Sequence, residues 1–167
     1  RTSSVKRQAQ QKLRRPDLEV VEFRGNLQTR LKKLENQVAE ATFLAMAGLK
    51  RLKMDEVPRQ AIEVDDMLPA VAQGAIGIER RINDRRMADM LAAIHDHETG
   101  QRLAAERAFL AALDGSCETP IAGLSELQGN MMRLRGEVLR PDGSDAIQDD
   151  MVVPIEDGAK AGQEMAA

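Results

Sequence analysis

The only thiol in the chain belongs to Cys117, which lies in the loop segment 113–121, LDGSCETPI. Gly115, Ser116 and Pro120 flank it, and these residue types build turns rather than hydrophobic cores. A sulfur held in an ordered loop is either a packing residue or a covalent tether. Because free cysteines are most often buried and inert, the residue type alone favours packing.

Two cations near the N-terminus stand where a helix normally avoids them. Lys6 and Arg7 fall in the first turn of a predicted helix that Ser3 or Ser4 caps. The helix dipole is positive at this end and favours Asp or Glu. A bound anion would accept hydrogen bonds from the free backbone N–H groups and pair with both cations.

The same placement of cations recurs further along the chain. Arg24 ends a predicted strand, Gly25 allows a turn, and Arg30 lies early in the next predicted helix, whereas Lys50 and Arg51 follow a second predicted strand. A single arginine is most simply a solvated charge. The repetition favours a site for carboxylates, which match the guanidinium fork, or for phosphate. The chain contains no GxxxxGK[ST] or GxGxxG pattern, which argues against a nucleotide loop.

Charge is distributed unevenly along the 167 residues. Residues 1–53 hold 13 Lys and Arg against 5 Asp and Glu, and the remainder holds 11 against 22. The asymmetry indicates either solvated helix faces or a basic lobe that binds a polyanion. Three Phe without Tyr or Trp argue against a base-stacking nucleic-acid surface. The lone cysteine and the lack of an apolar leader or membrane span favour the cytoplasm.

The periodicity predicts strands alternating with helices up to about residue 95, which indicates α/β layering, followed by a small α+β unit. One predicted helix begins after Asp84 and places Met87, Met90, Leu91 and Ile94 on its inner face. The other predicted elements are helices over 3–14, 27–36 (capped by Asn26), 98–113 and 156–167, strands over 18–23, 42–46 and 73–79, and a hairpin of 131–139 with 145–153.

Seven stretches stand in order along nearly the whole chain: TSSVKRQAQ (2–10), RRPDLEVVEFRGNLQTRLKKL (14–34), LAMAGLKRL (44–52), LPAVAQGAIGIE (68–79), HETGQRLAAERAFLAAL (97–113), GSCETPIAG (115–123) and RPDGS (140–144). Their combination resembles the hydroxymethylbilane synthase family, also called porphobilinogen deaminase. None of the stretches would be specific alone.

The resemblance implies an enzyme of heme biosynthesis. The family joins four porphobilinogen molecules head to tail, releases ammonia each time, and yields the linear tetrapyrrole hydroxymethylbilane. The product grows on a dipyrromethane cofactor held by a thioether, and Cys117 matches the cysteine of that linkage. Acetate and propionate on each pyrrole make the growing chain a polyanion. The positions that match the cleft lining are Ser4, Lys6, Arg7, Arg24, Arg30 and Arg51, with Thr2, Ser3 and Gln73 as neighbours.

The resemblance also implies a three-domain α/β fold whose first two domains resemble a periplasmic-binding-protein pair. We expect residues 1–68 to form most of the second, basic domain. Residues 69–95 would be a hinge and return segment into the first domain, and 96–167 an α+β C-terminal domain that carries Cys117. The family's catalytic aspartate belongs to an N-terminal region absent from this chain. We therefore expect a fragment, cut at both ends, that is inactive alone.

The complete protein is expected to be a cytoplasmic monomer that acts on porphobilinogen without a metal, nucleic-acid or membrane partner. Three positions depart from the family pattern. Lys6 replaces an arginine and loses the bidentate fork, and segment 37–42 lacks a usual Tyr-Asp pair. Ala72 replaces a glycine, and its methyl group would crowd the backbone if φ is positive there.

Other interpretations use the same residues differently. A non-catalytic module could bind a carboxylate or phosphate at the basic helix ends, with Cys117 as an unmodified thiol. A nucleic-acid binder using residues 1–53 would show steep salt dependence. His95 and His97 have no Cys/His cluster to complete a metal site. For Glu106, an ion pair on a helix surface or between domains is the simplest expectation.

Overall fold

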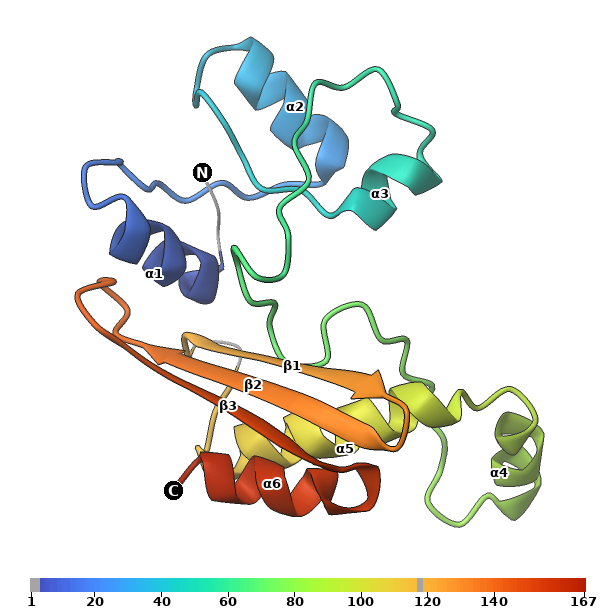
Figure 1. Cartoon of the computed structure of the whole chain (residues 1–167). Helices are drawn as coiled ribbons and strands as arrows, with labels where there is room; N and C mark the ends of the chain where they lie inside the picture. The colour runs from blue at the N-terminus through green and yellow to red at the C-terminus, as the bar shows by residue number, and fades with distance from the viewer. Residues whose placement is uncertain (1–3, 117–118) are drawn as a thin grey trace. The chain divides into compact units, whose positions relative to one another are not determined.

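The computed structural model describes residues 4–116 and 119–167, which form two compact units. Among the described residues, the helical unit comprises 4–67, 119–120 and 139–146, and the sheet unit comprises 68–116, 121–138 and 147–167. Figure 1 labels the elements: α1 (Val5–Arg14), α2 (Leu27–Glu35), α3 (Met46–Arg51), α4 (Arg85–Ala92), α5 (His97–Ala112), β1 (Ile121–Gln128), β2 (Met131–Leu139), β3 (Ala146–Pro154), the 3-10 helix η1 (Ile155–Asp157) and α6 (Gly158–Met165). No helix in the described ranges combines the length and apolar character that a membrane crossing needs.

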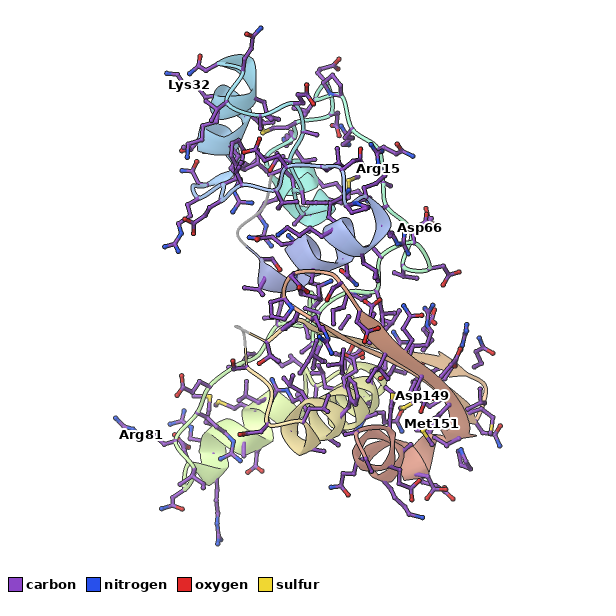
Figure 2. The ribbon with its side chains drawn as sticks, turned by 90° about the vertical axis from the view of Figure 1, so that its left-hand side faces the viewer. Arg15, Lys32, Asp66, Arg81, Asp149 and Met151 are labelled. Carbon is purple, nitrogen blue, oxygen red and sulfur yellow. The ribbon has the colours of Figure 1, made fainter. Side chains whose placement is uncertain are left out.

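A three-stranded antiparallel sheet with the order β1-β2-β3 organises the sheet unit. The first two strands pair in a register that sets Gly123 opposite Gly136. The hairpin of β2 and β3 confirms the sequence prediction, whereas β1 was not predicted. Figure 2 labels two residues of β3: Asp149 is exposed, and Met151 packs partly buried against the core.

Helices α5 and α6 lie side by side on one face of the sheet (Figure 1). Their close approach depends on glycine, because a Cβ built on Gly162 would stand 2.3 Å from the backbone oxygen of Ala105. The core beneath them contains Met132 and Leu134, both with no exposed surface. A side chain at Gly136 would meet the Phe109 ring at 2.8 Å, so the sheet also approaches α5 closely.

The helical unit contains α1, α2 and α3 joined by extended coil. The predicted strands over 18–23 and 42–46 are wrong, because neither segment has a ladder partner among the described residues. A strand satisfies its backbone groups only beside another strand, so β-branched composition does not suffice. Phe23 is nevertheless 1% exposed, which makes it the main buried anchor of the first of these segments.

Segment 68–95 of the sheet unit also departs from expectation. The strand predicted over 73–79 is absent from the described structure, and Ile76 and Ile82 are 87% and 89% exposed. Asp84 caps α4 as predicted, accepting a hydrogen bond from the Met87 N–H at 2.9 Å. The predicted inner face is wrong, since Met87, Met90 and Ile94 are all exposed and Leu91 is only partly buried.

The outcome for the fold class is therefore mixed. Helices and a sheet are both present, which is compatible with an α/β assignment, and the α+β character after residue 95 is confirmed. The alternation of strands and helices predicted before residue 95 is not found in the described residues, where that part of the chain holds helices and coil alone.

Candidate anion-binding site

Helix α1 begins as the sequence predicted. Ser4 is its N-cap and accepts a hydrogen bond from the Arg7 N–H at 3.4 Å. The first turn contains no acidic residue and carries both Lys6 and Arg7. Positive side chains therefore stand at the positive end of the helix dipole, an arrangement that a bound anion would stabilise. Thr2 and Ser3, the other candidates of this turn, lie outside the described residues.

Lys6 is buried, with 6% of its surface exposed. Its Nζ donates a hydrogen bond to Oε1 of Gln10 at 2.8 Å, one helical turn further on. An amide oxygen orients the ammonium but does not neutralise its charge. Lys6 therefore occupies a defined position on the packed face of α1 and is not a freely solvated surface lysine.

Arg7 and Arg30 are the two candidates that the structure brings within electrostatic range of each other. Burial lowers the pKa of the Arg7 guanidinium below its usual value, and the positive charge of Arg30 lowers it further. No carboxylate among the described residues forms an ion pair with Arg7. Two like charges, one of them half-buried, favour an anionic ligand between or beside them.

The turn before α2 positions Arg30. Gly25 has φ +128°, and a Cβ there would lie 2.8 Å from Cγ2 of Thr29, so glycine suits this turn. Asn26 caps α2 as predicted, accepting from the Thr29 N–H at 2.9 Å. Arg30 Nε then donates to the Gly25 carbonyl oxygen at 2.9 Å. This bond fixes the guanidinium close to the helix start.

Lys33, which was not a sequence candidate, adds a cation to this turn. Its Nζ donates to the Arg24 carbonyl oxygen at 2.9 Å and stands 5.4 Å from the centre of the Phe23 ring. Its spacing from Arg30, one turn along α2, is the signal that would have found it. Arg24 itself is highly exposed and pairs with Glu22 at 2.5 Å. Such an exposed pair contributes little and is easily exchanged for another anion.

The remaining candidates are placed less closely. Arg51 ends α3 and is exposed, and its guanidinium has no ion-pair partner in the described part of the chain. Gln73 belongs to the sheet unit, where it is exposed in a turn. Cys117 lies outside the described residues. The structure thus places Ser4, Lys6 and Arg7 in one helical turn, with Arg7 within electrostatic range of Arg30. The positions of Gln73 and Cys117 relative to them stay predictions.

Beside Gln73, the backbone and a buried acid form an arrangement that the sequence did not predict. Ala72 has φ +60°, so the substitution for glycine does fall at a position of positive φ. Its N–H donates to Glu106 Oε2 at 2.7 Å, and the Ser125 N–H donates to Oε1 at 2.8 Å. Glu106 is 5% exposed, so the expectation of a surface or interdomain ion pair is wrong. Its position one residue after the buried Ala105 and three before Phe109 was the available signal.

The rings of His95 and His97 meet edge to face, with centroids 5.0 Å apart. No group of three or more His, Cys, Asp or Glu suited to a metal ion occurs within the ranges that the structure describes. The two exposed rings flank Asp96, the N-cap of α5.

Comparison with known proteins gives a consistent result over both units. Residues 1–89 match the family model described as "Porphobilinogen deaminase, dipyromethane cofactor binding domain". Residues 101–167 match "Porphobilinogen deaminase, C-terminal domain". A porphobilinogen deaminase of Paracoccus denitrificans (strain Pd 1222) is 64% identical over 165 residues, which cover 99% of this chain and 53% of that protein. The chain therefore spans about half the length of the curated relative that it matches.

Proposed function

Because this chain belongs to the porphobilinogen deaminase family, we propose that it is the later part of an enzyme that polymerises porphobilinogen to hydroxymethylbilane. Each condensation forms one carbon–carbon bond and releases one molecule of ammonia. The observation that carries the proposal is the half-buried Arg7 within electrostatic range of Arg30, without an ion-pair partner among the described residues. A substrate with two carboxylates on every ring supplies the anions that such a pair requires.

The chain's residues fit a dipyrromethane cofactor, whose pyrrole rings carry the same acidic side arms. When bound, it supplies the nucleophilic pyrrole carbon to which substrate is added. Cys117 would hold it through a thioether, and the covalent link makes each addition effectively intramolecular. Holding reactants together in this way lowers a barrier by several kcal/mol in favourable systems.

The cationic and polar residues would bind and orient the carboxylates. Arg7 and Arg30 provide fixed charge, and Arg24 can leave Glu22 to follow a moving carboxylate, since their pair is exposed. Lys6 offers a point charge where a guanidinium would bind bidentately, so we expect one weaker contact. The full proposed lining is Thr2, Ser3, Ser4, Lys6, Arg7, Arg24, Arg30, Arg51 and Gln73.

We further propose the domain organisation that the family resemblance implies. Residues 1–68 would form most of a second domain of periplasmic-binding-protein type, and 96–167 the domain that carries Cys117. Residues 69–95 would return into a first domain that this chain does not contain. The exposed isoleucines 76, 78 and 82 support this proposal, because a buried return strand would hide such side chains.

The complete protein would act as a monomer on this small-molecule substrate without nucleic-acid or membrane partners. A thiol reserved for a thioether favours the reducing cytoplasm. No acidic residue of the chain matches the family's catalytic aspartate. We therefore expect the 167-residue chain alone to show no turnover of porphobilinogen, and measurable turnover by it would contradict this.

Intact-mass analysis of the complete protein tests the proposal. We expect a mass increment equal to two porphobilinogen-derived units, which disappears in Cys117→Ser. The matched control is Ser116→Ala, which leaves the thiol and should keep the increment. An unmodified thiol in protein that converts porphobilinogen would overturn the assignment of Cys117.

The pair of arginines also suits a second function, binding of carboxylate or phosphate without catalysis. This alternative predicts saturable binding of such ligands by the complete protein, an unmodified Cys117 and no release of ammonia from porphobilinogen. An ammonia assay on the complete protein therefore separates the two functions, because only the enzyme produces it.

A further inference from the structure

A buried carboxylate in the sheet unit has backbone groups as its partners instead of a cation. Glu106 is 5% exposed, yet none of its oxygens lies in an ion pair within the described chain. Its two oxygens accept the N–H groups of Ala72 and Ser125 at 2.7 and 2.8 Å. A buried carboxylate is unfavourable unless such bonds satisfy it, so both are expected to be kept in the folded protein.

The two donors come from segments far apart in the sequence. Ser125 lies in β1, which also donates from the Gly123 N–H to the Pro69 carbonyl oxygen at 3.0 Å. Ala72 lies in the segment Pro69–Gly74, whose residues 71–74 form a turn. A Cβ added to Gly123 would stand 3.0 Å from Cγ2 of Val71, so this turn runs tightly along β1. Glu106 therefore ties α5, β1 and the turn at one point.

The turn itself is conformationally demanding. Ala72 at φ +60° adopts a conformation that residues other than glycine seldom occupy, and Gly74 follows at φ +86°. The Gln73 N–H bonds to the Ala70 carbonyl oxygen at 3.1 Å, which closes the turn locally. Without the carboxylate, the Ala72 N–H would lose its partner and the unfavourable φ would favour opening.

We propose that Glu106 is a positioning residue: its carboxylate fixes the Pro69–Gly74 turn on α5 and β1 and thereby sets where Gln73 is presented. Gln73 stands in the turn one residue after the hydrogen-bonded Ala72, so a change at Ala72 moves it directly. The functional half of this inference rests on the proposed function, which gives Gln73 a role in binding. The structural half, the fixing of the turn, does not depend on that role.

Hydrogen exchange of the complete protein tests the structural half. Glu106→Gln retains size and one acceptor oxygen but turns an N–H₂ group toward one of the two donors. We expect amide exchange at residues 70–75 to rise about tenfold or more, with exchange at 132–136 of β2 unchanged within about twofold. The matched control is Glu98→Gln, on the exposed side of α5, which should change neither segment. Equal acceleration of both segments, or none at 70–75, would overturn the inference.

A double-mutant cycle on porphobilinogen turnover tests the functional half. If Glu106 acts through Gln73, Glu106→Gln lowers kcat/KM about tenfold when it is the only substitution in the complete protein. The same substitution lowers kcat/KM by less than about twofold when Gln73→Ala is already present. A merely structural role would give the same loss in both backgrounds and would refute the link to Gln73. Complete absence of turnover in the parent protein would instead refute the proposed function, because the exchange result does not require activity.

Discussion

Replacing Ala72 by glycine should strengthen the sheet unit, although it removes a methyl group. An L-residue in the left-handed region costs about 1–2 kcal/mol relative to its favoured conformations. Glycine avoids this term but adds about 0.4–1 kcal/mol of unfolded-chain entropy. Because Ala72 has φ +60°, the midpoints of the two terms leave a net gain of about 0.8 kcal/mol in the free energy of unfolding.

Ala75 supplies the matched control. It is half-buried like Ala72, lies three residues further along, and is not among the residues with positive φ. Ala75→Gly therefore carries the entropy term alone and should destabilise by about 0.4–1 kcal/mol. The difference between the two substitutions isolates the backbone term, which we expect to be about 1–2 kcal/mol.

The assay is native-state hydrogen exchange of the complete protein, read at amides of α5 and β2 that exchange only when the sheet unit opens. Both variants are measured under the same conditions as the parent protein. If Ala72→Gly destabilises the unit as much as Ala75→Gly does, then Ala72 is not held at positive φ and the reasoning about this turn fails.

Three further outcomes are expected. Arg7→Gln should lower cofactor occupancy, measured by intact mass, at least tenfold. It should not reduce the stability of the apoprotein, because it removes the repulsion between Arg7 and Arg30. The control Arg15→Gln, at an exposed arginine, should leave occupancy unchanged. Asp96 caps α5 and accepts a hydrogen bond from a backbone N–H, which lowers the pKa of its carboxyl. Asp96→Ala should therefore lower the melting temperature at pH 7. This difference from the unsubstituted protein should disappear as the pH falls below about 4, through the lowered pKa, because the protonated carboxyl loses its advantage. Gly162→Ala should destabilise by about 1–3 kcal/mol in urea titrations because its Cβ meets the α5 backbone, whereas Gly77→Ala, with open space around it, should not destabilise.

Local signals in the sequence predicted the helices of the described residues except α3, which begins at the end of the strand predicted over 42–46. Asn26 and Asp84 were identified as caps, and the first cap was narrowed to Ser3 or Ser4, of which the structure shows Ser4, because the capping bond joins residues only three apart. The hairpin of β2 and β3 was likewise predicted, since a Pro-Asp-Gly turn joins its two strands directly. Interactions between residues close in the sequence can be predicted from the identities of those residues.

Strands were predicted poorly because their partners decide them. β1 reads IAGLSELQ, which is poor in β-branched residues, and its pairing with β2 and packing on Phe109 override that composition. Segments 18–23 and 73–79 show the opposite case, with favourable composition and no neighbouring strand in the described residues. Both errors have the same cause: a segment forms a strand only where another strand lies beside it, and composition does not show whether one does.

The candidate site divides in the same way. The sequence correctly placed cations at the starts of α1 and α2, and the structure adds that Arg7 is half-buried near Arg30. The sequence could not show that the Glu106 carboxylate accepts hydrogen bonds from two backbone N–H groups, because these donors lie 34 and 19 residues away along the chain. For Cys117 the assignment depends on the family resemblance, because the residue lies outside the described part of the chain.

The exposed isoleucines before α4 bear on how this polypeptide should be handled in the laboratory. Ile76 and Ile82 leave almost their whole side chains in water, with Ile78 between them at 57% exposed. Recombinant expression of the 167 residues alone is therefore expected to give inclusion bodies, because exposed apolar surfaces associate at high protein concentration. The double substitution Ile76→Lys and Ile82→Lys would place charge on that surface and should return the product to the soluble fraction.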